Sequence, residues 1–272
     1  MADVARERHT QQQLESSDER EALGEVVLAF DVGGSFVKAG LVAVTSGLVL
    51  GEALRRPTPP GAAPEDVLDL LVEMARDLPT SGAVGLAFPS VAKNGVAWTA
   101  ANIDKRWIGM NVQTHLQARL QRPIAFLNDA DAAGVAEMTL GAGRHRHAGT
   151  VMVLTLGTGI GTALFVDGRL VPNTELGHLE VGGREAEHRA SAKVRAERQL
   201  DWVEWAAEVN VVLAAYHALL WPDVFIVGGG VTENWEHFGS LLNSRAEIVR
   251  AAFGNDAGII GAAMAAFQLG RG

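Results

Sequence analysis

Three glycine-rich turns follow apolar runs of the sequence and could hold phosphate groups. They lie at 31–35 (DVGGS), 157–161 (GTGIG) and 228–231 (GGGV). Glycine leaves the backbone N–H groups of a turn unobstructed, which suits phosphate oxygens, although none of the three turns matches the P-loop pattern. Each turn alone could be a simple hairpin that needs positive φ. The three together, with Asp31 opening the first, predict a nucleotide or phosphate clamp.

Asp129 is a candidate general base. It stands where an apolar strand predicted over 123–129 ends and a helix predicted over 131–140 begins, a place where side chains face a cleft. A carboxylate there can orient a hydroxyl group and accept its proton. The alternative is that Asp129 only caps the helix, but Asp131 is available for that role. We therefore favour the catalytic interpretation.

Strands and helices at regular spacing position these residues. When Gly33 is aligned with Gly157, apolar residues match on both sides, so 25–44 and 151–171 both predict a strand, a glycine turn and a strand. Two copies about half a chain apart indicate two similarly built lobes. Further strands are predicted over 83–91 and before the third glycine turn. Helical spacing predicts helices from Pro64, over 107–121, over about 202–219 and at the Ala-rich C-terminus.

The composition excludes several classes of protein. The chain has 272 residues, of which 48% are hydrophobic and 20% charged, so it can build a packed core. It has no cysteine, which excludes a disulfide scaffold, a cysteine nucleophile and a thiolate metal site. A net charge of −9 argues against general binding to nucleic acids or anionic membranes. No segment reads as a membrane span or a secretion signal, so we expect a cytoplasmic protein with a mobile tail over residues 1–24.

The motifs stand in the order seen in sugar kinases of the actin-like ATPase superfamily. Together with ELGH at 175–178, they most closely resemble the ROK family of bacterial glucokinases. The segments TAANIDKRWIG, LNDADAAGVAE and LVPNTELGHLE are similar to the polyphosphate-using glucokinases and glucomannokinases of that family. The resemblance covers roughly residues 25–270. It implies an α/β, two-lobed, ribonuclease H-like fold with the active site in the cleft between the lobes. The expected small N-terminal lobe is 25–128, with a helix over 257–272 packing back on it, and the large C-terminal lobe is 129–256.

One segment departs from the pattern of the family. Most ROK proteins follow the histidine of this motif with a cysteine-rich zinc loop, whereas residues 180–191 here read EVGGREAEHRAS. Because the chain has no cysteine, we expect no zinc at that site. The polyphosphate-using branch shares this loss.

The resemblance also implies which residues contact a sugar. Glu175 and His178 are three apart and would meet on one face of a helical turn, although without the family such a pair would more simply be a surface pair. Asp104 is expected only to stabilise its loop. The sugar-binding residues implied are Asn102, Asn128, Asp129, Glu175, His178 and, across the altered segment, Glu187.

A second set of residues is implied for the phosphoryl donor. Asp31 is expected to hold Mg²⁺ through water, with an Asx turn as the alternative. For Lys38, phosphate contact and simple surface exposure remain equally open. A long polyanion would also need cationic side chains, for which Lys105, Arg106 and Arg144 are the first candidates. The phosphate and nucleotide contacts implied are Asp31, Gly33, Gly34, Ser35, Lys38, Gly157, Thr158, Gly159, Gly228, Gly229 and Gly230.

The implied activity is transfer of a terminal phosphoryl group from inorganic polyphosphate or ATP to the 6-hydroxyl of glucose. Whether mannose is also an acceptor is left open. The expected protein is a monomer or homodimer that uses Mg²⁺ and binds neither nucleic acid nor membrane. A polyphosphate or nucleotide phosphatase of the same superfamily is a rival that would not need the sugar residues. A sugar-responsive ROK regulator is disfavoured, because only about two dozen hydrophilic residues precede the first predicted strand, too few for a helix-turn-helix unit.

Overall fold

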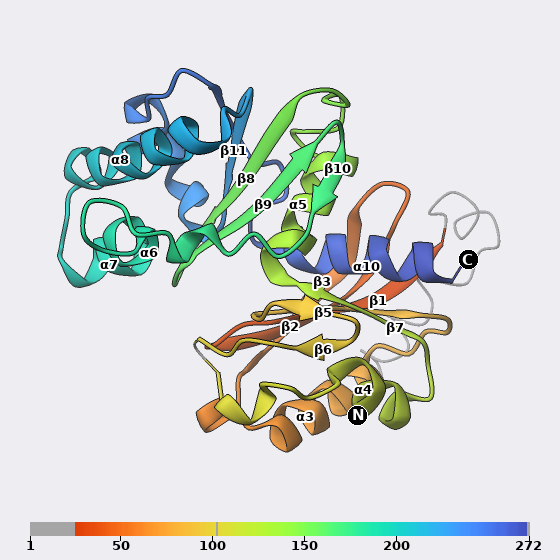
Figure 1. Ribbon diagram of the computed structural model, residues 1–272. Helices are drawn as coiled ribbons and strands as arrows, with labels where there is room; N and C mark the ends of the chain where they lie inside the picture. The colour runs from red at the N-terminus through yellow and green to blue at the C-terminus, as the bar shows by residue number, and fades with distance from the viewer. Residues whose placement is uncertain (1–24, 102, 271–272) are drawn as a thin grey trace, which may run out of the picture.

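Two five-stranded sheets with the same strand order form the frame of the protein (Figure 1). The computed structural model describes residues 25–101 and 103–270, so the predicted tail, Asn102 and the last two residues lie outside the described part. The first sheet has the order β3-β2-β1-β4-β7 and the second the order β10-β9-β8-β11-β12. In each sheet, three antiparallel strands precede two parallel ones. The α/β class and the repeated strand–turn–strand units predicted from the sequence are therefore confirmed.

The strands follow the predicted apolar runs closely. Both central parallel strands, β4 and β11, are buried along their whole length, as expected for strands covered on both faces. The strands of the first sheet are β1 Val26–Val32, β2 Phe36–Ala43, β3 Leu48–Pro57, β4 Val84–Phe88 and β7 Ile124–Asn128, with a separate hairpin of β5 Ala92–Lys93 and β6 Val96–Ala97. Those of the second are β8 Thr150–Leu156, β9 Ile160–Val166, β10 Arg169–Val171, β11 Val224–Gly228 and β12 Glu247–Arg250.

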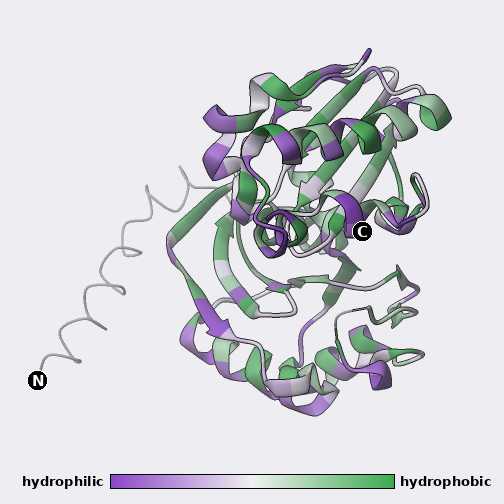
Figure 2. Ribbon diagram, turned by 90° about the vertical axis from the view of Figure 1, so that its left-hand side faces the viewer, coloured by the Kyte–Doolittle hydropathy of each residue, from purple (hydrophilic) through white to green (hydrophobic). Residues whose placement is uncertain are grey.

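Amphipathic helices cover the outer face of each sheet. Helices α3 Pro64–Asp77 and α4 Val112–Leu120 bury side chains against the first sheet in one apolar cluster. Helix α8 Trp202–Leu220 packs on the second sheet, together with the short helices α6 Ala186–Ala190 and α9 Trp235–Phe238; α7 Ala192–Glu197 follows α6. Figure 2 shows the hydrophobic residues concentrated on the strands and on the helix sides that face them. Within the described residues, no helix has the length and apolar character that a bilayer crossing requires.

Two helices lie between the sheets, and each packs on the sheet from which it does not emerge. Helix α5 Asp129–Thr139 follows β7 of the first sheet but packs on β8 and β9 of the second. Helix α10 Ala257–Leu269 follows β12 of the second sheet but packs on β1 and β4 of the first (Figure 1). The two helices touch backbone to backbone, since a Cβ atom on Gly261 would lie 1.7 Å from the carbonyl oxygen of Ala132. This exchange of helices joins the two halves of the chain.

The sequence misplaced the start of two helices. The helix predicted over 107–121 is a short 3-10 turn at Lys105–Trp107 followed by α4, because Gly109 has φ of +85° and Asn111 caps the later start. Helix α5 begins at Asp129 rather than at 131, and its N-cap is Asn128, whose side-chain oxygen accepts from the Asp131 N–H. Asp131 is therefore not the cap that the sequence suggested.

A buried carboxylate ties the end of α5 to the loop that leads into α10. Glu137 of α5 is 1% exposed and accepts hydrogen bonds from the N–H groups of Ala142, Ala252 and Phe253 at 2.9–3.0 Å. We expect Glu137→Ala to lower the free energy of unfolding by about 3 kcal/mol or more, because three backbone donors lose their shared carboxylate acceptor. Urea unfolding measures the loss, and Glu73→Ala, on the exposed side of α3, is the matched control. Equal losses in the two variants would contradict this role of Glu137.

Candidate active site

A cavity of about 260 Å³ lies where the glycine turns of the two sheets face each other. The first turn contributes Gly33 and Gly34 from between β1 and β2, and the second contributes Gly157, Thr158 and Gly159 from between β8 and β9. We call this the larger cavity. Its other predicted lining residues are Asn128, Asp129, Glu175, His178, Glu187 and Gly229.

A smaller cavity of about 150 Å³ adjoins the larger one. The two cavities share three lining residues, Asp129, Thr155 and Gly229. Of these two cavities, Asp31 and Lys38 line the smaller and not the larger, while the Glu175–His178 turn lines the larger and not the smaller. Asp129 therefore places its carboxylate at the junction of the larger and smaller cavities, which are otherwise lined by different residues.

Some of the predicted residues lie elsewhere. Of the described residues, Ser35, Gly228 and Gly230 line neither cavity. Ser35 is exposed, and its carbonyl accepts from the Thr58 N–H at 3.0 Å. Gly228 is the buried last residue of β11, and Gly230 is covered by the side chain of Asn255. Asn102 lies outside the described residues.

Asp129 combines partial burial with a local hydrogen bond. It is the first residue of α5, and its Oδ1 accepts from the Ala130 N–H at 2.8 Å. Burial raises the pKa of Asp129 to about 7, and the negative charge of Asp31 acts in the same direction. Because Asn128 supplies the helix cap, the capping alternative does not account for Asp129. A carboxylate with this pKa suits proton transfer near neutral pH.

The larger cavity carries a cluster of polar side chains on one wall. Asn128 donates from Nδ2 to the Ser90 carbonyl and to Glu175 Oε1, both at 3.1 Å. Glu175 Oε2 lies 3.8 Å from His178 Nε2, so the two side chains meet across a 3-10 turn as their spacing predicted. Burial raises the pKa of Glu175, an effect that His178 partly opposes.

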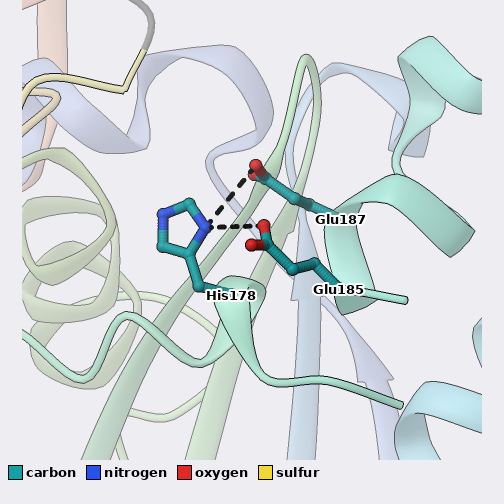
Figure 3. A group of neighbouring side chains, drawn as sticks. All are labelled: His178, Glu185 and Glu187. Atoms are coloured by element: carbon teal, nitrogen blue, oxygen red, sulfur yellow. Dashed lines mark hydrogen bonds and ion pairs between the residues drawn. The ribbon is translucent and has the colours of Figure 1, made fainter. Parts of the chain in front are cut away.

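His178 also faces two carboxylates from the altered segment (Figure 3). Its Nδ1 lies 3.1 Å from Glu185 Oε2 and 3.7 Å from Glu187 Oε1. The hydrogen bond to Glu185 raises the pKa of His178, and the charges of Glu187, Glu185 and Glu175 add to the rise. Glu187 further reaches the second glycine turn, since a Cβ atom on Gly159 would lie 2.3 Å from its Oε2. Sequence reasoning missed Glu185, because its approach to His178 depends on the fold of residues 179–186.

The smaller cavity carries the acidic group of the first glycine turn and a lysine beside it. Asp31 lies directly opposite Lys38 in the pairing of β1 with β2. Burial raises the pKa of Asp31 to about 6, although the charge of Lys38 opposes this rise. Lys38 Nζ donates to the backbone carbonyl of Asn255. The structure thus turns Lys38 toward the cavity rather than away from it.

Two further lining residues of the smaller cavity with polar side chains were missed. When the two glycine turns are aligned, Thr155 takes the position of Asp31. The internal repeat could therefore have identified Thr155 as a site residue. Asn255 precedes α10 and had no signal in the sequence.

The oxygen atoms of the smaller cavity suit a hard divalent cation. Asp31 and Asp129 offer carboxylates and Thr155 a hydroxyl, a set of donors that fits Mg²⁺. On the wall of the larger cavity, His178, Glu185 and Glu187 also bring three potential ligand atoms within 4.8 Å of one another. The oxygen-only set includes Asp129, the candidate base, which makes it the better match for phosphate chemistry.

Comparisons with known proteins show related sequences over most of the chain. The polyphosphate glucokinase of Mycobacterium tuberculosis (strain H37Rv) is 44% identical over 236 residues, which cover 86% of this chain and 89% of that protein. The polyphosphate glucokinase of Mycobacterium leprae is 42% identical over 86% of this chain and 72% of its own length.

Solved structures show the same fold. The inorganic polyphosphate/ATP-glucomannokinase of Arthrobacter sp. strain KM superposes with a TM-score of 0.87 at 42% identity, over 90% of this chain and all of that one. A ROK family glucokinase from Streptomyces griseus has a TM-score of 0.76 at 23% identity over 91% of this chain and 99% of its own, a likeness of fold. The two-lobed α/β architecture predicted from the motif order is thus confirmed. The profile of the ROK family matches residues 27–198, and the chain belongs to the ROK family.

Proposed function

We propose that this protein is a glucokinase that transfers the terminal phosphoryl group of inorganic polyphosphate or ATP to the 6-hydroxyl of glucose. The position of Asp129 at the junction of the two cavities carries the proposal. The larger cavity has the hydrogen-bonding wall that a sugar needs and the two glycine turns that suit the transferring phosphate. The smaller cavity has the lysine and the carboxylates that suit the rest of a phosphate chain and its cation. The activities by which the relatives are named, polyphosphate glucokinase and polyphosphate/ATP-glucomannokinase, support both substrates.

The proposed reaction passes through Asp129. The glucose 6-hydroxyl donates a hydrogen bond to the Asp129 carboxylate, which takes the proton as the sugar oxygen attacks the terminal phosphorus. A new O–P bond forms, and the bond to the bridging oxygen of the donor breaks with its electron pair. The N–H groups of the turns at Gly33–Gly34 and Gly157–Gly159 stabilise the charge on the transferring group.

A divalent cation accompanies the donor in kinases of this family, and we propose that it is Mg²⁺. Asp31 would hold it through water, with Thr155 as a further oxygen donor nearby. When bound, such an ion neutralises negative charge on the donor phosphates. Asp31 has a raised pKa because it is buried, and binding of a cation favours its ionised form.

Closure of two lobes around the sugar completes the proposal. We assign residues 25–128 with α10 to one lobe and residues 129–256 to the other. Asn173 joins them, because its side chain accepts from the Ala92 N–H at 2.7 Å and donates to the Ala92 carbonyl at 3.1 Å. Closure would exclude water, so that hydrolysis of the donor does not compete. We further propose that the protein acts in the cytoplasm as a monomer or homodimer and binds neither nucleic acid nor membrane, in keeping with its charge of −9.

A donor and acceptor assay tests the proposal. The purified protein is incubated with Mg²⁺, a panel of hexoses including mannose, and either ATP or polyphosphate. We expect glucose 6-phosphate with both donors. Release of phosphate at the same rate without hexose would contradict a kinase and favour a phosphatase.

The wall of the larger cavity yields a prediction about sugar affinity. Glu175→Gln and His178→Ala should each raise the KM for glucose by about ten- to a hundredfold, because each variant loses a charged hydrogen-bonding partner of the sugar. The KM for either donor should change much less. Glu180→Gln, on an exposed residue next to the same turn, is the matched control. If the variants raised the KM for the donor and left that for glucose unchanged, this wall would not be the sugar site.

A further inference from the structure

Three charged residues stand in line across the first sheet. Asp31 on β1 lies opposite Lys38 on β2, and Lys38 lies opposite Arg55 on β3. Residues directly opposite one another in adjacent strands project from the same face of a sheet. This face is the one on which α10 packs, since Gly40, two residues after Lys38, contacts Ile259. The line therefore runs from the smaller cavity to the edge strand β3.

An open groove follows the same line. It has a volume of about 920 Å³ and is lined by Lys38 and Arg55, by the turn around Gly47 and by residues 252–256. We call it the outer groove. Lys38, Asn255 and Asp256 border it, and the first two of these also line the smaller cavity. A chain that leaves the smaller cavity past Lys38 would thus enter the outer groove.

The two cations of the outer groove are not neutralised by ion pairs. Among the described residues, neither Lys38 nor Arg55 forms an ion pair with a carboxylate, although Glu52 and Asp256 also border the groove. The exposed guanidinium of Arg55 lies 3.7 Å from the centroid of the Phe36 ring. Stacking on a ring holds a guanidinium by its face and leaves its N–H edge available for phosphate oxygens.

Other cations near the site are already engaged. Arg106, which the sequence suggested for a polyanion, pairs with Asp104 at 2.8 Å and with Glu65 at 3.5 Å. Lys105 donates to the carbonyl of Ala100 and, unlike Lys38, lines neither the smaller cavity nor the outer groove. Arg56, the neighbour of Arg55 on the opposite face of β3, pairs with Asp77 at 2.7 Å.

We propose that a polyphosphate donor leaves the smaller cavity over Lys38 and lies in the outer groove against Arg55. The inference rests on the proposed use of polyphosphate by this protein. Beyond its third phosphate, polyphosphate remains anionic, whereas ATP continues into an uncharged adenosine. A cation placed beyond the reacting phosphates therefore serves the longer donor, and the fork of an arginine matches two phosphate oxygens.

The test compares Arg55→Gln with Arg56→Gln. For Arg55→Gln, we expect the KM for long-chain polyphosphate to rise about tenfold relative to the KM for ATP, because one charged phosphate contact is lost. Triphosphate, which has fewer phosphate groups to extend past Lys38, should show a smaller change than the long chain. Arg55→Lys, which keeps the charge but not the fork, should recover part of the loss. Arg56→Gln should behave as the wild type, and thermal unfolding checks that all variants are folded.

Two results would overturn the proposal in different ways. If the wild type uses polyphosphate but Arg55→Gln and Arg56→Gln have the same KM for it, the path over Arg55 is wrong and the proposed function stands. If the wild type phosphorylates glucose with ATP alone, both the polyphosphate donor and the groove are wrong. Binding of long-chain polyphosphate, measured by titration calorimetry without glucose, gives a second readout: Arg55→Gln should weaken it and reduce its dependence on salt.

Discussion

Replacing Asp129 by alanine should lower the kcat for glucose phosphorylation by about 10²–10⁴-fold, the usual contribution of a general base. The fold should be retained, because Asn128 and not Asp129 caps α5. Steady-state kinetics with saturating glucose and either donor measure the effect. Asp129→Asn, which keeps the shape of the side chain, should be as inactive as the alanine variant. A variant that kept more than about a tenth of the wild-type kcat would remove Asp129 from the mechanism.

The raised pKa of Asp129 adds two pH-dependent expectations. Only the carboxylate can accept a proton, so the wild-type kcat/KM should rise with pH through an acid limb near the pKa of about 7. Because the folded protein disfavours the charged form, Asp129 lowers the stability progressively as the pH rises from its ordinary pKa of 3.8 to about 7, and the full loss remains above that pH. Asp129→Asn should therefore be more stable than the wild type at pH 8 and gain less at pH 5. An acid limb near pH 4 would contradict the raised pKa of Asp129, because it would match the ordinary pKa of an aspartate.

Gly261→Ala should destabilise the protein by about 3 kcal/mol or more, because the new methyl group overlaps the backbone of α5. The added Cβ atom would lie 1.7 Å from the carbonyl oxygen of Ala132, and a backbone atom in a packed helix cannot move aside cheaply. Alanine favours a helix over glycine, so helix propensity alone predicts the opposite sign. Urea unfolding measures the difference.

Gly270→Ala is the control for this prediction. Gly270 follows α10, and its added Cβ atom would meet only ordinary contacts at 3.7 Å and beyond. We expect a change within about 0.5 kcal/mol, as for most surface substitutions. A loss of stability of the same size in both variants would mean that crowding between α5 and α10 is not the cause.

Local chemistry made most of the fold predictable. Alternating apolar residues and glycine turns are short-range signals, so the strands on either side of Gly33 and Gly157 lie where the sequence placed them. The predicted start of α4 was wrong, because Gly109 adopts a positive φ that the spacing of apolar residues does not reveal. The sharing of helices between the sheets was not predictable in detail, since no periodicity shows on which sheet a helix will pack.

The residues of the candidate site also fall into those that the sequence could indicate and those that it could not. The meeting of Glu175 with His178 follows from a spacing of three residues, and Thr155 could have been found from the aligned repeat. Glu185, Asn255 and Arg55 reach the site through tertiary contacts and register, which a single sequence does not display.

On the ribosome, the first sheet is made long before the helix that covers its inner face. Val27, Ala29 and Val42 are buried in one cluster with Ile259, Ala263 and Met264 of α10, so this side of the sheet stays uncovered until the whole second sheet has been translated. Such long-range contacts slow folding and leave apolar surface open to aggregation. A nascent chain stalled before Ala257 would thus present a binding surface for chaperones, and a truncated protein ending there would lack the helix that covers the first sheet, although α5 could still cover the second.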